Sequence, residues 1–464
     1  MKLLSKVNIP LIVRIEGLLL LLEGLFMLLV LPFTYFYSGV YVFSMPVSAL
    51  ITLMMGFVMM VATRSHKNDK TTSRDGVVVV CISWLILSLF GCLPYLFSKS
   101  VPNFTDAFFE ALSGFTTTGA TVLTNIESVS KDILFWRSMT QWIGGLAIIA
   151  FPIAILPFLS IGGMQLFITE LNGITYDKLH PRIMHTVKRV WFLYMFFTLL
   201  ETFLLCLGDM NLYDALCHSM TTISSGGFST RNANISAFSG YSQMVVCAFM
   251  VLSGCNFTLL LLCIFRGRFV AVFRDEEFSA YLKNIFFVSI GFVLVLLFVN
   301  HVGAATAFRQ SFFSVVSCIT TTGFYVTDYS QWPLFLLLFM LLLIFVGGCS
   351  GSSSGGIRVI RHLIFVRNSF LELKRIIHPN AIIPVKINSK SLTSNGVYKN
   401  IIFIFIYFFV FVAGTMILLS MGIDFATSIG ASLGTLSNVG VSIGSVGPFG
   451  SYVFMPQAAK WILM

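Results

Sequence analysis

Four short polar runs, each containing a glycine, recur between long apolar segments of this 464-residue chain. They are FTTTGAT (115–121), SSGGFST (224–230), ITTTGFY (319–325) and LSNVGVS (436–442). In each run, small hydroxyl or amide side chains precede a glycine, and a non-polar or aromatic residue follows it. Backbone carbonyls presented by such a run can replace the hydration shell of a monovalent cation. We therefore predict that the four runs together form one ion filter.

The residue types in these runs favour a monovalent over a divalent cation. None of the four contains Asp or Glu, so they offer no ring of carboxylates. Glycine permits the backbone angles and the close approach that a carbonyl-lined segment requires. A single glycine in an apolar helix is as readily explained by helix–helix packing. Four runs in equivalent positions favour the filter.

A short segment precedes each run, at 104–115, 212–223, 305–319 and 424–436. Because these segments are too short to span the hydrocarbon, we predict four half-helices that point their C-terminal carbonyls toward the filter. Asp106, Asp214 and Asp424 lie near their starts, where a carboxylate can cap exposed N–H groups. The third segment has Gln310 at the position of Asp106 and Asp214, so the match is imperfect.

Longer apolar segments flank the half-helices, at 76–98, 133–160, 187–208, 240–265, 284–301, 332–346 and 399–421, and a helical hairpin (8–33 and 41–63) precedes them. The predicted fold is an all-α polytopic membrane protein with four pseudo-repeated helix–pore loop–helix units around a central pore. The predicted domains are the hairpin with a cytoplasmic loop (1–75) and repeat units at 76–180, 181–275, 276–395 and 396–464.

Glu16 and Glu23 share one face of the first helix. We favour packing in the interior for them, with an ion site as the alternative.

Composition and charge placement support a membrane protein. The chain is 57% hydrophobic and 10% charged, against about 25% charged in soluble domains. All but six of its 29 Lys and Arg residues fall in five clusters, at the N-terminus and at 64–74, 178–189, 266–283 and 358–399. Alternating spans place these clusters on one side, which the positive-inside rule makes cytoplasmic, together with the N-terminus. Topology therefore explains the net charge of +10 without nucleic acid.

Enzyme chemistry has little support in the sequence. The nine cysteines form no CxxC pair, and the seven histidines show no HExxH spacing. His218, in the second half-helix, is a lone histidine that we interpret as a structural partner. We find no cleavable signal peptide, because the first apolar segment is too long and a second span follows it. We predict no enzyme activity and no bound cofactor other than K⁺ in the pore.

The third unit contains VGGCSGSSSGGIR (346–358) where a helix should continue. Such a segment cannot hold a stable helix in lipid, so it must be buried or line the pore. A surface loop is the alternative, but apolar sequence resumes at Ile357–Val366. We predict a gate whose flexibility comes from its glycines, Gly347, Gly348, Gly351, Gly355 and Gly356.

The four-fold plan with filters TTTGAT, SSGGFST, TTTGF and SNVGVS resembles the Trk/Ktr/HKT superfamily of potassium transporters over essentially the whole chain. The N-terminal hairpin, LPFLSIGGMQLFITE (156–170) and GPFGSYVFMPQAAKWILM (447–464) add to the resemblance. It implies a K⁺-translocating homodimer in the bacterial inner membrane, regulated by a cytosolic TrkA-like nucleotide-binding subunit. It also implies that the loop 346–358 obstructs the ion path.

In this family, the filter carbonyls come from the residues just before and at each glycine. Carried over, the ion-binding residues are Thr117, Thr118, Gly119, Ser225, Gly226, Gly227, Thr321, Thr322, Gly323, Asn438, Val439 and Gly440. Gly119 resembles the K⁺-selective version, because members with serine at this position tend to favour Na⁺. The relatives continue beyond Met464 through a further helix with a pore-facing arginine, so we expect the fourth unit to lack its second helix through truncation.

Two other functions compete with gated K⁺ uptake. An ion-coupled secondary transporter, moving K⁺ with H⁺ or Na⁺, would use inverted repeats and broken helices. Inverted repeats would place matching loops on opposite faces of the membrane, whereas the charge pattern places all four runs on one face. A purely structural scaffold would not require four filter-like runs.

Overall fold

The computed structural model describes residues 8–38, 43–64, 73–155, 180–267, 269–381 and 383–464, and these form helices with one short hairpin. The α-helices are α1 (Ile9–Ser38), α2 (Ser44–Ala62), α3 (Ser73–Gly91), α4 (Leu93–Phe97), α5 (Phe104–Phe115), α6 (Lys131–Ile155), α8 (His180–Cys206), α9 (Leu212–Ile223), α10 (Gly240–Ser253), α11 (Phe257–Arg266), α12 (Phe269–Phe273), α13 (Glu276–Phe298), α14 (Ala304–Ile319), α15 (Leu334–Val346), α16 (Val359–Ile377), α17 (Ser394–Ser420), α18 (Phe425–Leu436) and α19 (Gln457–Leu463). Strands β1 (Lys386–Ile387) and β2 (Lys390–Ser391) pair antiparallel. The predicted all-α class is confirmed.

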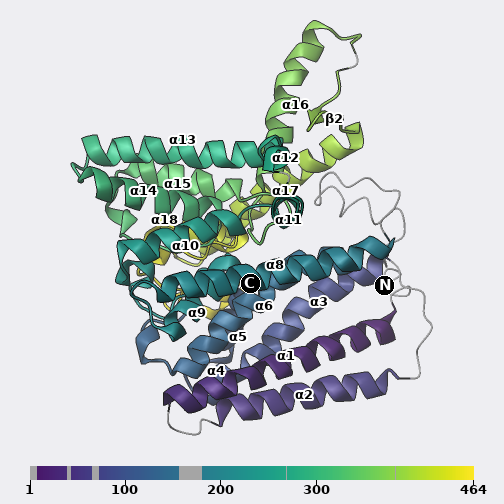
Figure 1. Ribbon diagram of the computed structural model, residues 1–464, viewed down its shortest axis with the longest axis vertical. Coiled ribbons are helices and arrows are strands. Elements are labelled where there is room, and N and C mark those ends of the chain that lie inside the picture. Colours follow the sequence, from purple (N-terminus) through teal and green to yellow (C-terminus); the bar gives the residue numbers. More distant parts are fainter. Residues whose placement is uncertain (1–7, 39–42, 65–72, 156–179, 268, 382) are drawn as a thin grey trace.

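Six described helices are long and apolar enough to cross a membrane, and these spans lie in α1, α2, α3 with α4, α8, α13 and α17. Figure 1 shows α1, α2, α3, α8 and α13 running in about the same direction across the view. Many of their large apolar side chains are exposed, as lipid-facing surfaces require. The chain is therefore a multi-pass membrane protein. The predicted motif at 156–170 and most of the loop 64–75 lie outside the described residues.

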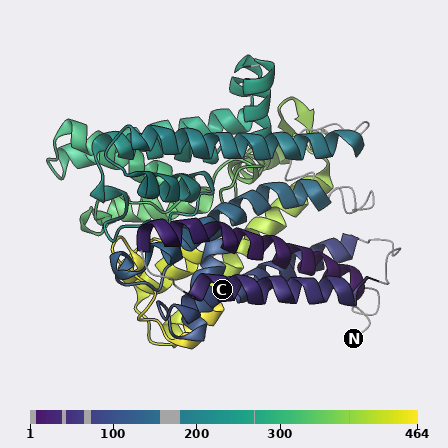
Figure 2. The same ribbon diagram turned by 60° about the horizontal axis from the view of Figure 1, so that its bottom comes forward.

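The N-terminal hairpin packs through small residues. Helices α1 and α2 lie side by side in Figures 1 and 2, and a Cβ added at Gly17 would lie 3.0 Å from the Gly56 carbonyl oxygen. Glu16 and Glu23 are both buried, as predicted. Ser83 Oγ donates to Glu16 Oε1 at 2.8 Å, which ties α3 to α1. The shared glutamate face therefore packs into the protein interior.

The four predicted half-helices are present, and their bounds agree to within one residue. They are α5, α9, α14 and α18, and each carries its polar run at its C-terminal end. The capping prediction is right only for Asp424, whose carboxylate accepts from Thr427 N–H at 3.0 Å. Asn103 caps α5 and Asn211 caps α9 instead.

The two other aspartates make different contacts, because an asparagine three residues earlier already satisfies the helix start. Asp106 accepts a hydrogen bond from Lys460 Nζ at 2.6 Å, which ties α5 to the C-terminal helix α19. Asp214 accepts from Thr230 Oγ1 at 2.6 Å and from Arg231 at 3.0 Å. Both carboxylates therefore hold elements around the filter rather than cap a helix.

A single continuous helix at 240–265 was predicted, and this prediction is wrong. The segment forms α10 and α11, which meet at an angle of 101°. The Asn256 side chain accepts from Thr258 N–H at 2.8 Å and so starts a new helix after Gly254 and Cys255. The break brings α11 toward the glycine-rich segment at 347–356.

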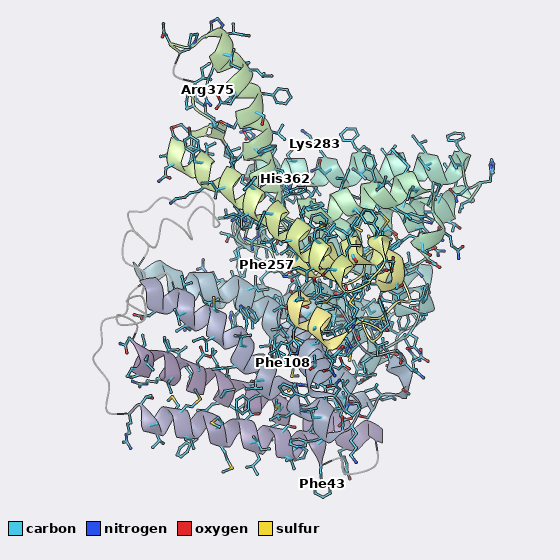
Figure 3. The ribbon with its side chains drawn as sticks, turned by 180° about the vertical axis from the view of Figure 1, so that it is seen from behind. Phe43, Phe108, Phe257, Lys283, His362 and Arg375 are labelled. Atoms are coloured by element: carbon cyan, nitrogen blue, oxygen red, sulfur yellow. The ribbon has the colours of Figure 1, made fainter. Side chains whose placement is uncertain are left out.

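Helix α16 points away from the bundle, across the direction of α13 (Figure 1). Its face containing Ile360 and Ile364 packs on Val385, Ile387 and Val397, from the β-hairpin region and α17. We call residues 359–393 the arm. Arg375 lies on the arm in Figure 3, and Arg367 joins the arm to α13 through an ion pair with Glu276.

Candidate ion filter and gate loop

The four polar runs share one backbone conformation. In each, the glycine and the residue two positions before it have left-handed φ angles. The pairs are Thr117 (+58°) with Gly119 (+79°), Ser225 (+56°) with Gly227 (+77°), Thr321 (+55°) with Gly323 (+80°) and Asn438 (+57°) with Gly440 (+72°). A left-handed residue other than glycine costs about 1–3 kcal/mol and persists only where its surroundings hold it. The same pair of left-handed φ angles recurs in all four runs, so the four turns are equivalent in backbone conformation.

Each turn is held by the same hydrogen bond to its own half-helix. The N–H of the residue before the glycine donates to the carbonyl five residues upstream. The bonds run from Thr118 to Ser113 (2.9 Å), from Gly226 to Thr221 (2.9 Å), from Thr322 to Ser317 (3.0 Å) and from Val439 to Gly434 (2.8 Å). Each run therefore turns back directly from the C-terminal end of its helix, where carbonyls carry partial negative charge.

The four runs close a ring. A Cβ added at Gly119 would overlap the Gly226 carbonyl oxygen, and one at Gly227 would overlap that of Thr322. A Cβ at Gly323 would overlap the Val439 carbonyl oxygen, and one at Gly440 would overlap Gly119 itself. Each glycine thus lies against the backbone of the next run, and run four returns to run one. Only glycine allows this approach, because any Cβ would occupy the neighbour's carbonyl position.

All twelve predicted filter residues lie in this ring. Eleven of them are buried, and Asn438 is half-buried. Thr118 Oγ1 donates to Asn438 Oδ1 at 2.9 Å, so side chains also join the first and fourth runs. The structure therefore brings together every residue of the predicted filter.

The predicted gate loop lies against one end of the ring. Ser353 Oγ is 2.8 Å from Ser225 Oγ and donates to the Ile223 carbonyl at 3.0 Å. Gly355 N–H donates to Thr321 Oγ1 at 2.7 Å. A Cβ added at Gly355 would overlap the Ser437 carbonyl. The loop thus contacts runs two, three and four, at the residues that precede the filter glycines.

The loop is also tied to helices outside the ring. Ser350 N–H donates to Glu277 Oε1 at 2.6 Å, and Cys349 N–H donates to the Gly254 carbonyl at 2.9 Å. Phe257 N–H, at the start of α11, donates to the Gly351 carbonyl at 3.1 Å. Of the predicted gate glycines, Gly347, Gly351 and Gly356 have left-handed φ angles, whereas Gly348 and Gly355 serve close packing. The loop in this state is anchored on all sides.

Comparison with known proteins gives the family. The TrkH family model, described as a cation transport protein, matches residues 46–464. This chain belongs to the TrkH family. It is 38% identical over 420 residues to the "Trk system potassium uptake protein TrkH" of Escherichia coli K12. This alignment covers 89% of this chain and 86% of that protein. The protein of the same description from Vibrio parahaemolyticus is 36% identical and covers 98% of this chain and 94% of its own length.

A solved structure shows the same fold. The crystal structure of the potassium transporter TrkH from Vibrio parahaemolyticus superposes with a TM-score of 0.89 at 34% identity. It covers 98% of this chain and 95% of that chain. The identity and coverage make the TrkH-family architecture of this chain secure along nearly its whole length.

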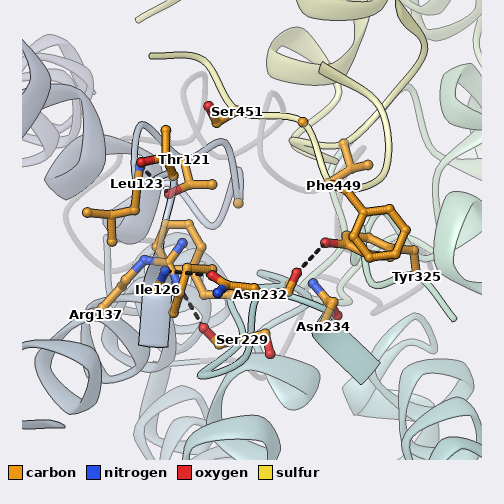
Figure 4. Close-up of a pocket in the computed structure, with 16 residues that line it drawn as sticks. Thr121, Leu123, Ile126, Arg137, Ser229, Asn232, Asn234, Tyr325, Phe449 and Ser451 are labelled. Carbon is orange, nitrogen blue, oxygen red and sulfur yellow. Dashed lines mark hydrogen bonds between the residues drawn. The ribbon is translucent and has the colours of Figure 1, made fainter. Parts of the chain in front are cut away.

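At the other end of the ring, this TrkH-family chain has a polar cavity of about 200 Å³ (Figure 4). Gly119, Gly227, Arg137, Tyr325 and Phe449 are among the residues that line it. We call this space the outer cavity. The Tyr325 hydroxyl donates to the Asn232 carbonyl at 3.0 Å. The cavity and the gate loop therefore lie at opposite ends of the four runs.

The ring of four runs has supports that the sequence analysis missed, namely Glu110, Arg137 and Gln141. Arg137 and Glu110 form a fully buried ion pair with 2.6 Å between Nε and Oε1. Gln141 Nε2 donates to the Gly226 carbonyl at 2.7 Å, and its Oε1 accepts from Phe228 N–H at 3.1 Å. One signal was present: Arg137 lies outside the five basic clusters and inside an apolar helix, where an isolated charge is expensive.

Proposed function

We propose that this chain is the K⁺-conducting subunit of a Trk-type uptake system in a bacterial cytoplasmic membrane. The observation that carries the proposal is the closed ring of four glycine turns, in which each glycine lies against the backbone of the next run. The four runs contain no acidic residue, so a monovalent cation is the ligand that suits them. Similarity to potassium uptake proteins and to a potassium transporter supports K⁺ as that cation.

Genetic complementation tests this function. The full chain should restore growth, in K⁺-limited medium, of a bacterium that lacks its own K⁺-uptake systems. Gly119→Ser should alter ion preference, because the added Cβ collides with the Gly226 carbonyl and the run must shift. No rescue by an inserted, expressed wild-type chain contradicts the transport proposal, and an unchanged ion preference in Gly119→Ser contradicts the filter assignment.

The loop 346–358 is the gate in this proposal. Its support is the set of contacts from Ser353 and Gly355 to runs two and three, together with its position opposite the outer cavity. Opening requires these bonds and the anchors to Gly254 and Glu277 to break or shift. A gate of this kind gives an external regulator a small number of weak contacts to change.

The working unit in this proposal is a homodimer that binds a cytosolic nucleotide-binding subunit. Its N-terminus is cytoplasmic, and the support is that the first residues of α1 and the basic arm lie at the same end of the long helices (Figure 1). The arm also exposes an apolar stripe of Val366, Phe370, Leu373 and Ile377, at the i, i+4, i+7, i+11 spacing of one helical face. A second copy of the chain is the partner assigned to this stripe.

The oligomeric state of the purified chain tests this assembly. Phe370→Asp places a charge in the stripe and should convert dimers to monomers in detergent, measured by light scattering. Ser369→Asp, which adds the same charge off the stripe, should leave the dimer intact. A Phe370→Asp variant that stays dimeric contradicts the assigned interface.

A further inference from the structure

A buried ion pair connects the first and second filter runs. Glu110 lies on α5 and Arg137 on α6, and their side chains are 0% and 2% exposed. The guanidinium carbon of Arg137 also lies 3.5 Å from the centre of the Phe228 ring. A buried pair gains enough attraction to offset its desolvation only if further hydrogen bonds satisfy its remaining atoms. Those further bonds go to the filter runs.

Glu110 holds the outer end of run one. Its Oε1 accepts from Thr121 Oγ1 at 2.9 Å, and its Oε2 accepts from Val122 N–H at 2.8 Å. Thr121 is two residues beyond Gly119 and lines the outer cavity. Hydrogen bonds to an ionised carboxylate are shorter and stronger than neutral ones, so run one is firmly fixed at this point.

Arg137 and Gln141 hold run two from one face of α6. Arg137 Nη1 donates to the Ser229 carbonyl at 3.1 Å, a contact visible in Figure 4. One helical turn later, Gln141 bonds to both Gly226 and Phe228. The planar guanidinium bonds to Glu110 and to run two at the same time. The single ammonium nitrogen of a lysine could not reproduce both contacts, because its donors all lie at one atom.

The corresponding positions of the other units lack this pair. Nine residues before the filter glycine, where unit one has Glu110, unit three has Ser314 and unit four has Ala431. The Ser314 hydroxyl is buried and has no hydrogen-bond partner among the described residues. Among the described residues, a buried ion pair that also hydrogen-bonds to two adjacent runs is therefore found at the run one–run two junction. The largely buried pair Lys460–Asp106 joins α19 to α5, and its printed hydrogen bonds go to no run.

We infer that Glu110 and Arg137 are positioning residues that set the ion preference of the filter, by fixing the distance between runs one and two. Ion preference depends on how many carbonyls meet the ion and how closely they can approach it. The inference rests on the proposed filter function of the ring. It assigns selectivity to a pair of side chains that need not touch the ion.

The test measures the K⁺/Na⁺ permeability ratio of the purified full chain in proteoliposomes, from the reversal potential under opposed K⁺ and Na⁺ gradients. Arg137→Lys keeps the charge beside Glu110 but loses the forked contact to Ser229, and should lower the ratio by about fivefold or more. Thr121→Val removes one hydroxyl contact to Glu110 and should lower it by about twofold. Ser314→Ala, at the matching position of unit three, is the control and should leave the ratio unchanged.

The outcomes separate this inference from the proposed function. A folded Arg137→Lys variant with the wild-type ratio overturns the inference. If that variant does not fold, Thr121→Val decides: a wild-type ratio overturns the inference, and a lowered ratio with an unchanged Ser314→Ala control supports it. If neither the wild-type chain nor Ser353→Ala, which lacks gate-loop contacts to run two, conducts K⁺, the proposed function is contradicted instead, since the ratio is then undefined.

Discussion

Units one and two of the filter differ from units three and four in what holds the same backbone turn. In the first two, an ionisable side chain on the half-helix reaches the residue two positions beyond the glycine: Glu110 contacts Thr121, and His218 Nε2 lies 2.9 Å from Ser229 Oγ. Ser314 and Ala431 occupy this place in the other units. In unit three, the Tyr325 hydroxyl instead bonds to the Asn232 carbonyl, just past run two, and the Tyr329 hydroxyl bonds to the Ser442 carbonyl of run four.

The candidate gate loop (346–358) lies mainly against the runs of units three and four, with a further contact to run two. It emerges from unit three and contacts runs two, three and four through Ser353 and Gly355. The run one–run two junction thus carries a fully buried ion pair, while the loop's contacts to the ring are neutral hydrogen bonds of about 1 kcal/mol each, apart from its anchor to Glu277 outside the ring. Equivalent backbones can therefore have unequal supports, and the weaker contacts lie beside the proposed gate loop.

Breaking the Glu110–Arg137 ion pair should have the largest effect on stability. Glu110→Ala leaves Arg137 as an uncompensated buried charge, which costs about 3–5 kcal/mol. Ser314→Ala, at the matching position, should cost no more than about 1 kcal/mol. The midpoint of thermal unfolding in detergent measures both. Similar midpoints for the two variants would contradict the contrast between the two halves of the ring.

The ring itself should tolerate no side chain at its glycines. Gly227→Ala should abolish K⁺ uptake, because its Cβ overlaps the Thr322 carbonyl. Gly422→Ala separates this overlap from backbone strain: its φ is also left-handed, at +83°, but nothing lies within 4 Å of the added Cβ. This control should cost about 1–2 kcal/mol and retain uptake. Uptake by Gly227→Ala at the level of Gly422→Ala would show that the runs are not closely apposed.

Loosening the gate loop should raise flux without altering the folded structure. Ser353→Ala removes its hydroxyl contacts to Ser225, to the Ile223 carbonyl and to the Ser253 carbonyl. Because one hydroxyl proton serves only one of these acceptors at a time, the loss amounts to about one hydrogen bond, or about 1 kcal/mol. The open state should therefore gain about fivefold in population, and K⁺ flux without the regulator should rise by a similar factor. Ser369→Ala, on α16, is the control. Unchanged flux through Ser353→Ala would remove the loop from the gating proposal.

The smallest effect should come from the ion pair at the rim of unit two. Arg231 is 42% exposed where it meets Asp214 at 3.0 Å, so Arg231→Gln should cost about 0–1 kcal/mol. At the matching position of unit one, Asp106 meets Lys460, whose side chain is 3% exposed, and Lys460→Met should cost more. Thermal unfolding in detergent compares the two variants. A larger loss for Arg231→Gln would show that burial does not rank these pairs.

Local features of the site were predictable because they depend on neighbouring residues. The four half-helices begin and end within a residue of their predicted bounds, since apolar spacing and polar runs mark both ends. The four polar runs were likewise recognisable from their repetition, whereas the individual candidate filter residues came from the resemblance to the superfamily. The helix caps were harder to predict, because Asn103 and Asn211 compete with Asp106 and Asp214 for the N–H groups at the helix starts. Spacing in the sequence did not show which side chain would cap each helix.

The sequence by itself determined that four glycine turns follow four short helices in an apolar chain, because each turn is set by its own residues and its own helix. Only the tertiary structure decided the order in which the turns meet, the 101° break between α10 and α11, and the pairing of Glu110 with Arg137 across 27 positions. These features depend on which carbonyl, amide or charge lies opposite in space. A residue's type shows that it needs a partner, and the packed fold decides which partner it finds.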